Sequence, residues 1–138
     1  MADTLKLEIV TPETTIYSED VEMVTLPGSE GEAGIYPNHV PLMTRVQAGE
    51  IIVNRSGTEE VVAIGEGFAE ITGDHIAILT DNAANSADID EAAAEEAKAK
   101  AEQRLEEGGD ISEEEAKALT QATLYSQAQI KAKRRKRG

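Results

Sequence analysis

The first stretch whose residues are spaced for chemistry is the glycine-rich segment 28–34, which reads GSEGEAG. Backbone amides of such a loop can cradle a phosphate when a helix follows the loop. Here no lysine and hydroxyl pair follows, Glu30 and Glu32 would repel an anion, and the chain continues into Ile35 and Pro37 instead of a helix. The spacing therefore favours glycines that serve turns over a phosphate site.

The histidines and carboxylates also lack the arrangement that catalysis requires. His39 and His75 are the only imidazoles, and neither has a second metal ligand at a typical spacing. The chain has no cysteine, which excludes disulfides and thiolate chemistry and fits a reducing compartment. No Gly-x-Ser-x-Gly motif occurs, and no pattern marks an acid and base pair among the carboxylates. We therefore expect a protein that is not an enzyme and holds no metal or cofactor.

A basic cluster closes the chain and consists of Lys131, Lys133, Arg134, Arg135, Lys136 and Arg137. These cations can simply be solvated at the C-terminal end of a helix, where positive charge complements the helix dipole. They can also form a patch that seeks an acidic protein surface. Binding to a polyanion or a membrane surface is the third interpretation, which the acidity of the remaining chain opposes.

Composition excludes further classes of protein. The 138 residues carry 27 acids against 13 bases, a net charge of −14, and residues 1–90 hold 17 of the acids with only three of the bases. With four aromatic residues and this charge, nucleic-acid binding is not expected. No run approaches the ~20 apolar residues of a membrane span, and the charges within residues 1–9 do not fit a signal peptide. We expect no insertion into a membrane.

The elements that must position these groups divide the chain in two. Apolar residues alternate in short runs up to about residue 80, and turn signals such as Pro27-Gly28, Ser56-Gly57 and Gly73-Asp74 separate the runs. This pattern predicts an antiparallel β-sandwich or barrel over residues 1–86. Alanine, glutamate and lysine dominate afterwards and predict helices over residues 87–138. The fold class is therefore α+β.

The helical part is predicted to be an antiparallel two-helix hairpin. Asp88 with Glu91 is a candidate cap for the first helix, Gly108 and Gly109 end it, and Ser112 with Glu115 form a capping box for the second. One apolar stripe is expected at Ala93, Ala97, Ala101 and Leu105, and its counterpart at Ala116, Leu119, Ala122, Ser126 and Ile130. Each methyl group contributes only about 0.8 kcal/mol when buried. We therefore expect a weakly docked, mobile arm.

Three segments carry a resemblance to a known family. PGSEGEAGIYPNHVPLMT (residues 27–44), GEGFAEI (65–71) and IDEAAAEEAKAKAEQRL (89–105) resemble the epsilon subunit of bacterial and chloroplast F-type rotary ATP synthase, and the resemblance spans essentially the whole chain. It implies a ten-stranded sandwich at the foot of the central stalk. The subunit would be non-catalytic and would couple the catalytic head to the ring that translocates protons, or sodium ions.

The resemblance also implies partners and contact residues. The partners would be the gamma subunit, the c-ring and the alpha/beta catalytic hexamer, at the cytoplasmic face of the bacterial inner membrane or the stromal side of a chloroplast thylakoid. Sandwich residues expected to face gamma and the ring are Ser29, Glu30, Glu32, Tyr36, His39 and Leu42. The hairpin would extend into the hexamer and block ATP hydrolysis, and the basic cluster would grip an acidic lobe of the beta subunit. We expect inhibition to depend on ionic strength.

Three departures from the family pattern limit these implications. Asn38 stands where glycine is usual, and asparagine tolerates the left-handed backbone. Glu66 replaces a common glycine. In the ATP-binding motif of some members, Ile89 and Asp90 match but Ala93 replaces the arginine, so weak or absent ATP binding is expected. An ATP-sensing module is the alternative function, and a polyanion-binding adaptor is a third hypothesis.

Overall fold

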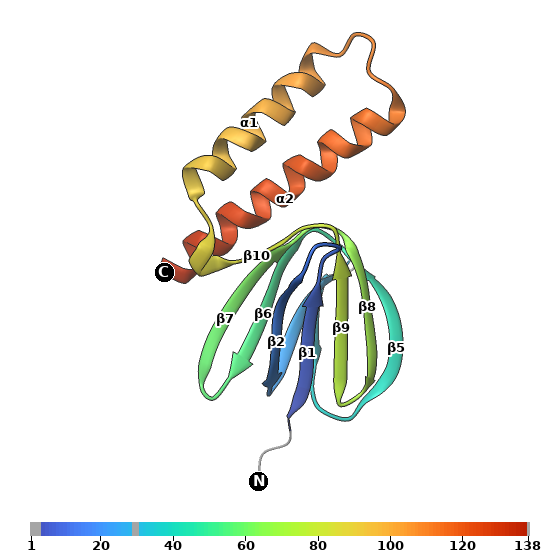
Figure 1. Cartoon of the computed structure of the whole chain (residues 1–138), viewed down its shortest axis with the longest axis vertical. Coiled ribbons are helices and arrows are strands. Elements are labelled where there is room, and N and C mark those ends of the chain that lie inside the picture. Colours follow the sequence, from blue (N-terminus) through green and yellow to red (C-terminus); the bar gives the residue numbers. More distant parts are fainter. Residues whose placement is uncertain (1–3, 29–30, 138) are drawn as a thin grey trace.

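The computed structural model describes residues 4–28 and 31–137 and consists of a β-sandwich with a helical hairpin at one end (Figure 1). The described residues form ten strands: β1 (Leu5–Val10), β2 (Thr15–Val21), β3 (Met23–Gly28), β4 (Gly31–Ile35), β5 (His39–Val46), β6 (Gly49–Arg55), β7 (Thr58–Ile64), β8 (Gly67–Gly73), β9 (His75–Thr80) and β10 (Ala83–Asn85). A short 3₁₀ helix, η1 (Ser86–Asp88), leads into α1 (Glu91–Glu107) and α2 (Glu113–Arg137). The predicted fold class is confirmed.

The strands form two five-stranded sheets. The first sheet has the order β2-β1-β9-β8-β5, and the second has the order β10-β7-β6-β3-β4. Every described pairing is antiparallel except that of β1 with β9, which is parallel. The parallel pair is a long-range contact, and strand alternation along the sequence could not predict it.

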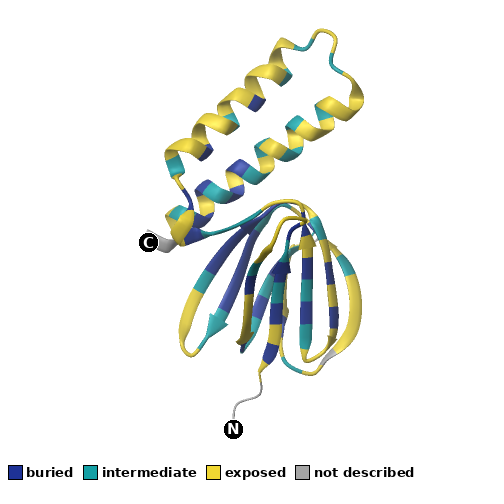
Figure 2. Cartoon of the chain, viewed as in Figure 1, coloured by how far each residue is buried: buried dark blue, intermediate teal, exposed yellow. Residues whose placement is uncertain are grey.

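The core lies between the two sheets. Alternation places Leu5, Leu7 and Ile9 of β1 on its inner face, where they are almost fully buried against strands such as β9 with Ile76 and Ile78. Burial alternates in the same way along β3, β8 and β9, whereas it is continuous from Glu50 to Val53 in β6 and from Val61 to Ile64 in β7 (Figure 2). These two strands are buried on both faces because α2 packs on their outer side. Burial of a large aliphatic side chain contributes about 1.5–3 kcal/mol, so this core stabilises the sandwich.

The helix ends correct one prediction and confirm two others. The first helix is capped by Asp90, whose carboxylate accepts a hydrogen bond from the Ala93 amide at 3.1 Å, and not by Asp88, which belongs to η1. Gly108 ends α1 with a φ of 60°, as expected. The Ser112 hydroxyl accepts a hydrogen bond from the Glu115 amide at 3.0 Å and caps α2, also as expected.

The predicted helix stripes are partly wrong. In α1 the buried residues are Ala94 and Ala101, whereas Ala93 and Ala97 are exposed. In α2 the buried side chains include Ser126 and Ile130, as predicted, but Ala122 is exposed. Two further buried residues of α2, Ala128 and Ala132, pack on the second sheet against Val61, Ala63 and Ile89.

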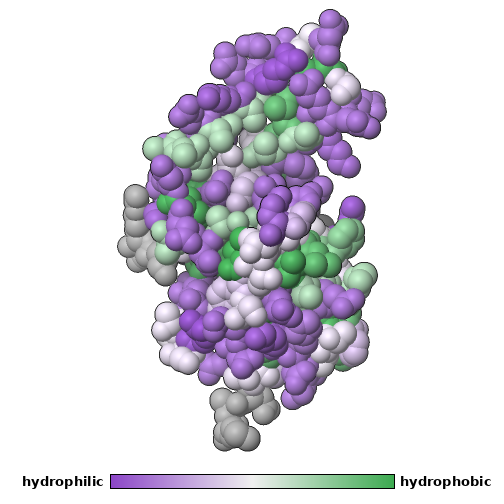
Figure 3. Space-filling view, viewed as in Figure 1, coloured by the Kyte–Doolittle hydropathy of each residue, from purple (hydrophilic) through white to green (hydrophobic). Residues whose placement is uncertain are grey.

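Packing of the hairpin on the sandwich comes mainly from α2, along β6 and β7. The outer surface of α1 is exposed over most of its length (Figure 2). The surface of the hairpin is mainly hydrophilic, with a pale band of weakly hydrophobic residues along its helices (Figure 3). The arm is therefore packed on the body mainly through the part of α2 that contains Ala128 and Ala132, with Ile89 beside it.

Candidate interaction surfaces

The residues predicted to face partners that the structure describes lie on β4, on β5 and in the turn between these two strands. Glu32 is exposed on β4, opposite Pro27 of β3. Tyr36 and Leu42 are exposed, Tyr36 to 61%. Ser29 and Glu30 lie outside the described residues. The backbone of His39 begins β5, while its side chain is outside the description.

The structure adds apolar residues to this surface that the sequence analysis did not single out. Val40 and Met43 are 74% and 63% exposed on β5, an edge strand of the first sheet. Consecutive large apolar side chains around Pro41 break the alternation of a half-buried strand, and that break is the signal that could have found them. Asn38 precedes this strand with a φ of 65°, the left-handed conformation expected of it. Because several exposed apolar side chains lie close together on β5, this strand is a candidate interaction surface.

A pocket of about 690 Å³ lies where β5, β8 and β9 meet the turn after β1. Its wall includes Phe68 and Leu79, both about half exposed, and Arg45, whose guanidinium carbon lies 5.6 Å from the centre of the Phe68 ring. A cation over an aromatic face is attracted by the ring quadrupole, which holds this arginine beside the pocket. The sequence analysis did not identify this pocket.

The basic cluster is bound to the molecule's own acids. Arg135 Nε lies 2.9 Å from one carboxylate oxygen of Glu50, and Lys131 Nζ lies 3.8 Å from the other. Arg134 lies 3.0 Å from both Glu91 and Glu95 of α1. The hydrogen bond to Glu50 is the main cause that raises the pKa of Arg135.

Of the three remaining cations of the cluster, the structure describes the side chain of Lys133 only. Lys133 Nζ donates to the carbonyl oxygens of Ser86 and Ala87, at 3.1 and 3.4 Å. The side chains of Lys136 and Arg137 lie outside the described residues. The described cations are therefore engaged within the chain when the hairpin is docked.

The two residues that match the ATP motif take part in packing and helix capping. Ile89 is buried in the contact between helix and sheet, Asp90 uses its carboxylate as a helix cap, and Ala93 is an exposed methyl group. A groove of about 680 Å³ between the helices is lined by cations, but Arg134 and Arg135 in its wall are held by carboxylates. No cluster of three metal-ligating side chains occurs within residues 4–28 and 31–137.

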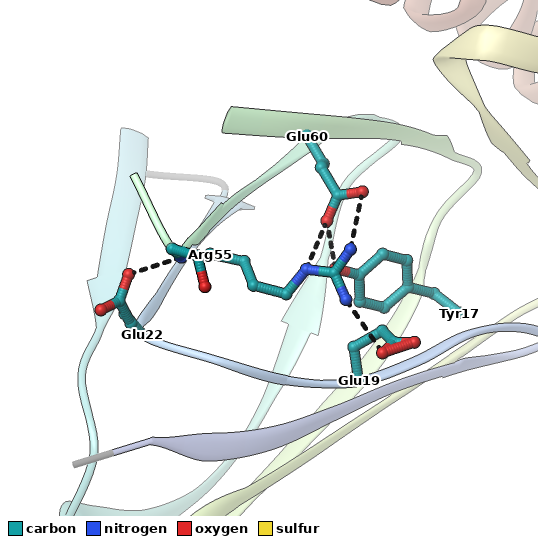
Figure 4. Close-up of polar contacts among 6 residues, drawn as sticks. Tyr17, Glu19, Glu22, Arg55 and Glu60 are labelled. Atoms are coloured by element: carbon teal, nitrogen blue, oxygen red, sulfur yellow. Dashed lines mark hydrogen bonds and ion pairs between the residues drawn. The ribbon is translucent and has the colours of Figure 1, made fainter. Parts of the chain in front are cut away.

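A polar network fastens the two sheets together at their edge (Figure 4). The Tyr17 hydroxyl of β2 donates to Glu60 of β7 at 2.7 Å, and the Arg55 guanidinium lies between Glu60 at 3.3 Å and Glu19 at 2.9 Å. Burial, followed by the hydrogen bond to Glu60, raises the pKa of Tyr17. These contacts join β2 of the first sheet to β6 and β7 of the second, so the network ties the two sheets together.

The described residues form a sandwich that exposes apolar side chains on an edge strand and carries a helical hairpin, which docks through alanine packing and ion pairs. Among the described helices, none is sufficiently long and apolar to cross a membrane. A sandwich with exposed apolar side chains and a second, helical unit docked on one sheet is typical of the class of subunits that bind partners.

Comparison with known proteins gives the family. The family model described as the ATP synthase delta/epsilon chain β-sandwich domain matches residues 4–86 of this chain. The ATP synthase epsilon chain of Laribacter hongkongensis is 40% identical over 131 residues, which cover 94% of this chain and 92% of that protein. The epsilon chain of Desulforamulus reducens is 42% identical over 109 residues, 79% of this chain and 83% of that protein. The chain belongs to the ATP synthase epsilon chain family and is an epsilon subunit of the F-type enzyme.

Solved structures show the same fold. A chain in the mitochondrial ATP synthase of Euglena gracilis, solved as an assembly with F1 and the c-ring, matches with a TM-score of 0.74 at 20% identity, over 94% of this chain and 81% of that one. A chain in the central stalk and c-ring of the Tetrahymena thermophila mitochondrial enzyme matches with a TM-score of 0.59 at 10% identity. The match covers 95% of this chain and 97% of that chain. At this identity the likeness extends to the fold alone.

Proposed function

We propose that this epsilon subunit couples the catalytic head of a proton-translocating ATP synthase to its c-ring and restrains ATP hydrolysis through its hairpin. The single observation that carries this proposal is the division of the molecule into a self-contained sandwich and an arm packed on it mainly through the part of α2 that contains Ala128 and Ala132. The sandwich can remain bound to a rotor while the arm leaves it. We assign residues 1–86 to the sandwich and residues 87–138 to the arm.

The sandwich contacts are assigned to the surface around β4 and β5. The apolar side chains of Val40, Leu42 and Met43 suit a hydrophobic surface of the gamma subunit, because burial of such groups drives stable association. Glu32 suits a basic or amide-rich loop of the c-ring because its carboxylate is exposed at the end of the sandwich. Tyr36 supplies an aromatic contact beside them. Ser29, Glu30 and His39 belong to the same proposed surface by their positions in the sequence.

The arm contacts are assigned to the basic cluster. In the complex, Lys131, Lys133, Arg134 and Arg135 would meet acidic surfaces of the beta and gamma subunits, with Lys136 and Arg137 beside them. The location we propose is peripheral, on the cytoplasmic face of the bacterial inner membrane, where the stalk meets the ring. ATP sensing remains the second candidate because the groove between the helices is lined by cations, but Ala93 supplies no donor to a phosphate.

Truncation tests the proposal in the assembled enzyme. A chain ending at residue 87 should still co-purify with gamma and the c-ring, while ATP hydrolysis by the complex rises several-fold relative to the full-length subunit. The matched control is a chain lacking only residue 138, which keeps both helices. Loss of gamma binding would contradict the assignment of the sandwich, and unchanged hydrolysis would contradict the inhibitory arm.

A further inference from the structure

The basic cluster divides into separate sets according to the helical period. Lys131 and Arg135 are four residues apart and face Glu50 on β6, whereas Arg134 faces Glu91 and Glu95 on α1. One set therefore ties α2 to the sandwich, and the other ties the two helices to each other. When the hairpin leaves the sheet, the contacts of Lys131 and Arg135 with Glu50 must break. The contacts of Arg134 with α1 can persist, because both helices move together.

Glu50 is the unusual member of these pairs. Its side chain is 4% exposed, whereas the carboxylates that Arg134 contacts are 18% and 52% exposed. It lies on β6 near the β7 surface where Ala128 and Ala132 of α2 pack, because the register pairs it with Ala63. A buried carboxylate is costly without a partner, and each of its oxygens faces a cation of α2. The docked helix thus supplies the charge that this site requires.

We propose that Glu50 is an internal latch: it occupies Lys131 and Arg135 while the hairpin is docked, and withholds these cations from an acidic partner until α2 leaves the second sheet. This inference rests on the mobile arm proposed above. The charges of Glu59 and Glu32 act on Arg135 in the same direction as Glu50, so the field around the latch is acidic. A partner surface that captures the arm must therefore compete with the sandwich for the same two side chains.

The latch changes the expected effect of salt. Screening weakens the attraction between the cluster and an acidic partner, but it also weakens the attachment to the sandwich, to a lesser degree because Glu50 is buried. Ionic strength alone therefore does not reveal which contact controls the arm. Substitution of Glu50 weakens only the attachment of α2 to the sandwich and leaves the attraction of the basic cluster to an acidic partner unchanged.

The test measures amide hydrogen exchange in the isolated full-length chain. Glu50→Gln should speed exchange in the last three turns of α2 about tenfold, because a charge-assisted contact is lost. Exchange in β1 and β9 should not change. Glu70→Gln, the same substitution at an exposed position on the other sheet, is the matched control and should leave α2 protected.

Two arginine substitutions separate the latch from the contact between helices. Arg135→Gln should reproduce the Glu50→Gln effect without any change in a strand, so it remains informative if Glu50→Gln disturbs β6. Arg134→Gln should instead speed exchange in α1 more than in the docked part of α2. The double variant Glu50→Gln/Arg135→Gln should exchange no faster than Glu50→Gln alone, because the two changes remove one interaction.

Specific results would overturn the latch. Unchanged α2 exchange in both Glu50→Gln and Arg135→Gln, with the sandwich intact, would mean that apolar packing and the hydrogen bonds of Lys133 to Ser86 and Ala87 hold the hairpin without the latch. Additive effects in the double variant would mean that Glu50 and Arg135 act separately. Because these measurements use the isolated chain, their failure is distinct from a failure of truncation to raise ATP hydrolysis in the complex.

Discussion

Gly67 is a position at which the chain accepts no side chain. A methyl group there would run into the backbone carbonyl of Leu79 on the neighbouring strand. Glu66, which replaces a common family glycine, is exposed and meets no such obstacle. The sequence analysis noted that Glu66 stands where glycine is expected. Only the close approach of β8 to β9 reveals that the neighbouring Gly67 cannot carry a side chain.

At Tyr17, a single hydroxyl joins the two sheets, and its removal should be measurable. Tyr17→Phe should lower the free energy of unfolding by about 1 kcal/mol at neutral pH, because the hydrogen bond that the hydroxyl donates to Glu60 is lost. Urea unfolding measures this loss. Tyr36→Phe, at an exposed position, should leave the free energy within about 0.5 kcal/mol of the original.

The same substitution has a predicted pH dependence. Tyr17 keeps its proton in the folded chain because its pKa is raised, while in the unfolded chain it ionises near its ordinary pKa of about 10. The unfolded state therefore loses protons first, and stability falls as the pH rises above about 10. The advantage of the original chain over Tyr17→Phe should narrow in that range. An advantage that is constant or widens there would contradict the raised pKa.

Among the elements, the start of α1 shows how a local motif can mislead. Asp88 and Glu91 have the spacing of a capping box, but Ser86–Asp88 form a 3₁₀ turn that leads into the buried Ile89. The helix can begin only after this anchor, and Asp90 becomes its cap. Burial of Ile89 against the second sheet is a long-range effect, and a capping pattern contains no information about it.

Substitution at the two aspartates tests this assignment. Asp90→Ala should weaken the first turn of α1 by about 1 kcal/mol, because the Ala93 amide loses its acceptor. Amide exchange in that turn should quicken about fivefold, corresponding to this free energy. Asp88→Ala is the matched control and should have a smaller effect. Equal effects would indicate that charge near the helix terminus, and not the cap, stabilises α1.

The alanine stripes were predicted with the right composition and a phase that is only partly right: Ala101, Ser126 and Ile130 are buried as predicted, whereas Ala93, Ala97 and Ala122 are exposed. A stripe at a strict spacing of four residues drifts around a helix of 3.6 residues per turn, so burial moves to Ala94 and stays at Ala101. In α2 the sequence analysis assigned one apolar face, whereas the helix must serve both α1 and the sheet. Ala128 and Ala132 belong to the second of these contacts, which depends on a surface built by β6 and β7.

For the whole molecule, the sequence predicted the sandwich, the hairpin and their order, because alternation and capping are local signals. It predicted the basic cluster but not its partners, because Glu50 lies far from Arg135 along the chain and its burial depends on docking. Of the exposed residues on the proposed gamma-facing surface, the sequence analysis named Tyr36 and Leu42. Val40, which lies within the segment 36–42 assigned to this surface, was not named individually, and Met43 was missed, because an exposed apolar side chain on an edge strand resembles a core residue in the sequence.

The difference in packing predicts an order of protection across the molecule. The sandwich buries large side chains such as Leu7 and Ile78, while the contact between sheet and arm is made largely of alanine methyl groups, each contributing about 0.8 kcal/mol. Amides of β1 and β9 should therefore exchange most slowly and those of α1 most rapidly, by about a hundredfold or more, with the docked end of α2 between them.

Hydrogen exchange on the isolated chain, resolved by peptide, measures this order. The chain ending at residue 87 supplies the control, because its sheets should retain the protection of β1 and β9 when the arm is absent. Protection of α1 equal to that of β1 would mean that arm and sandwich open only together. A hairpin that could not open separately would have no means of leaving the sandwich while the stalk contacts persist, and the proposed inhibitory arm would fail with it.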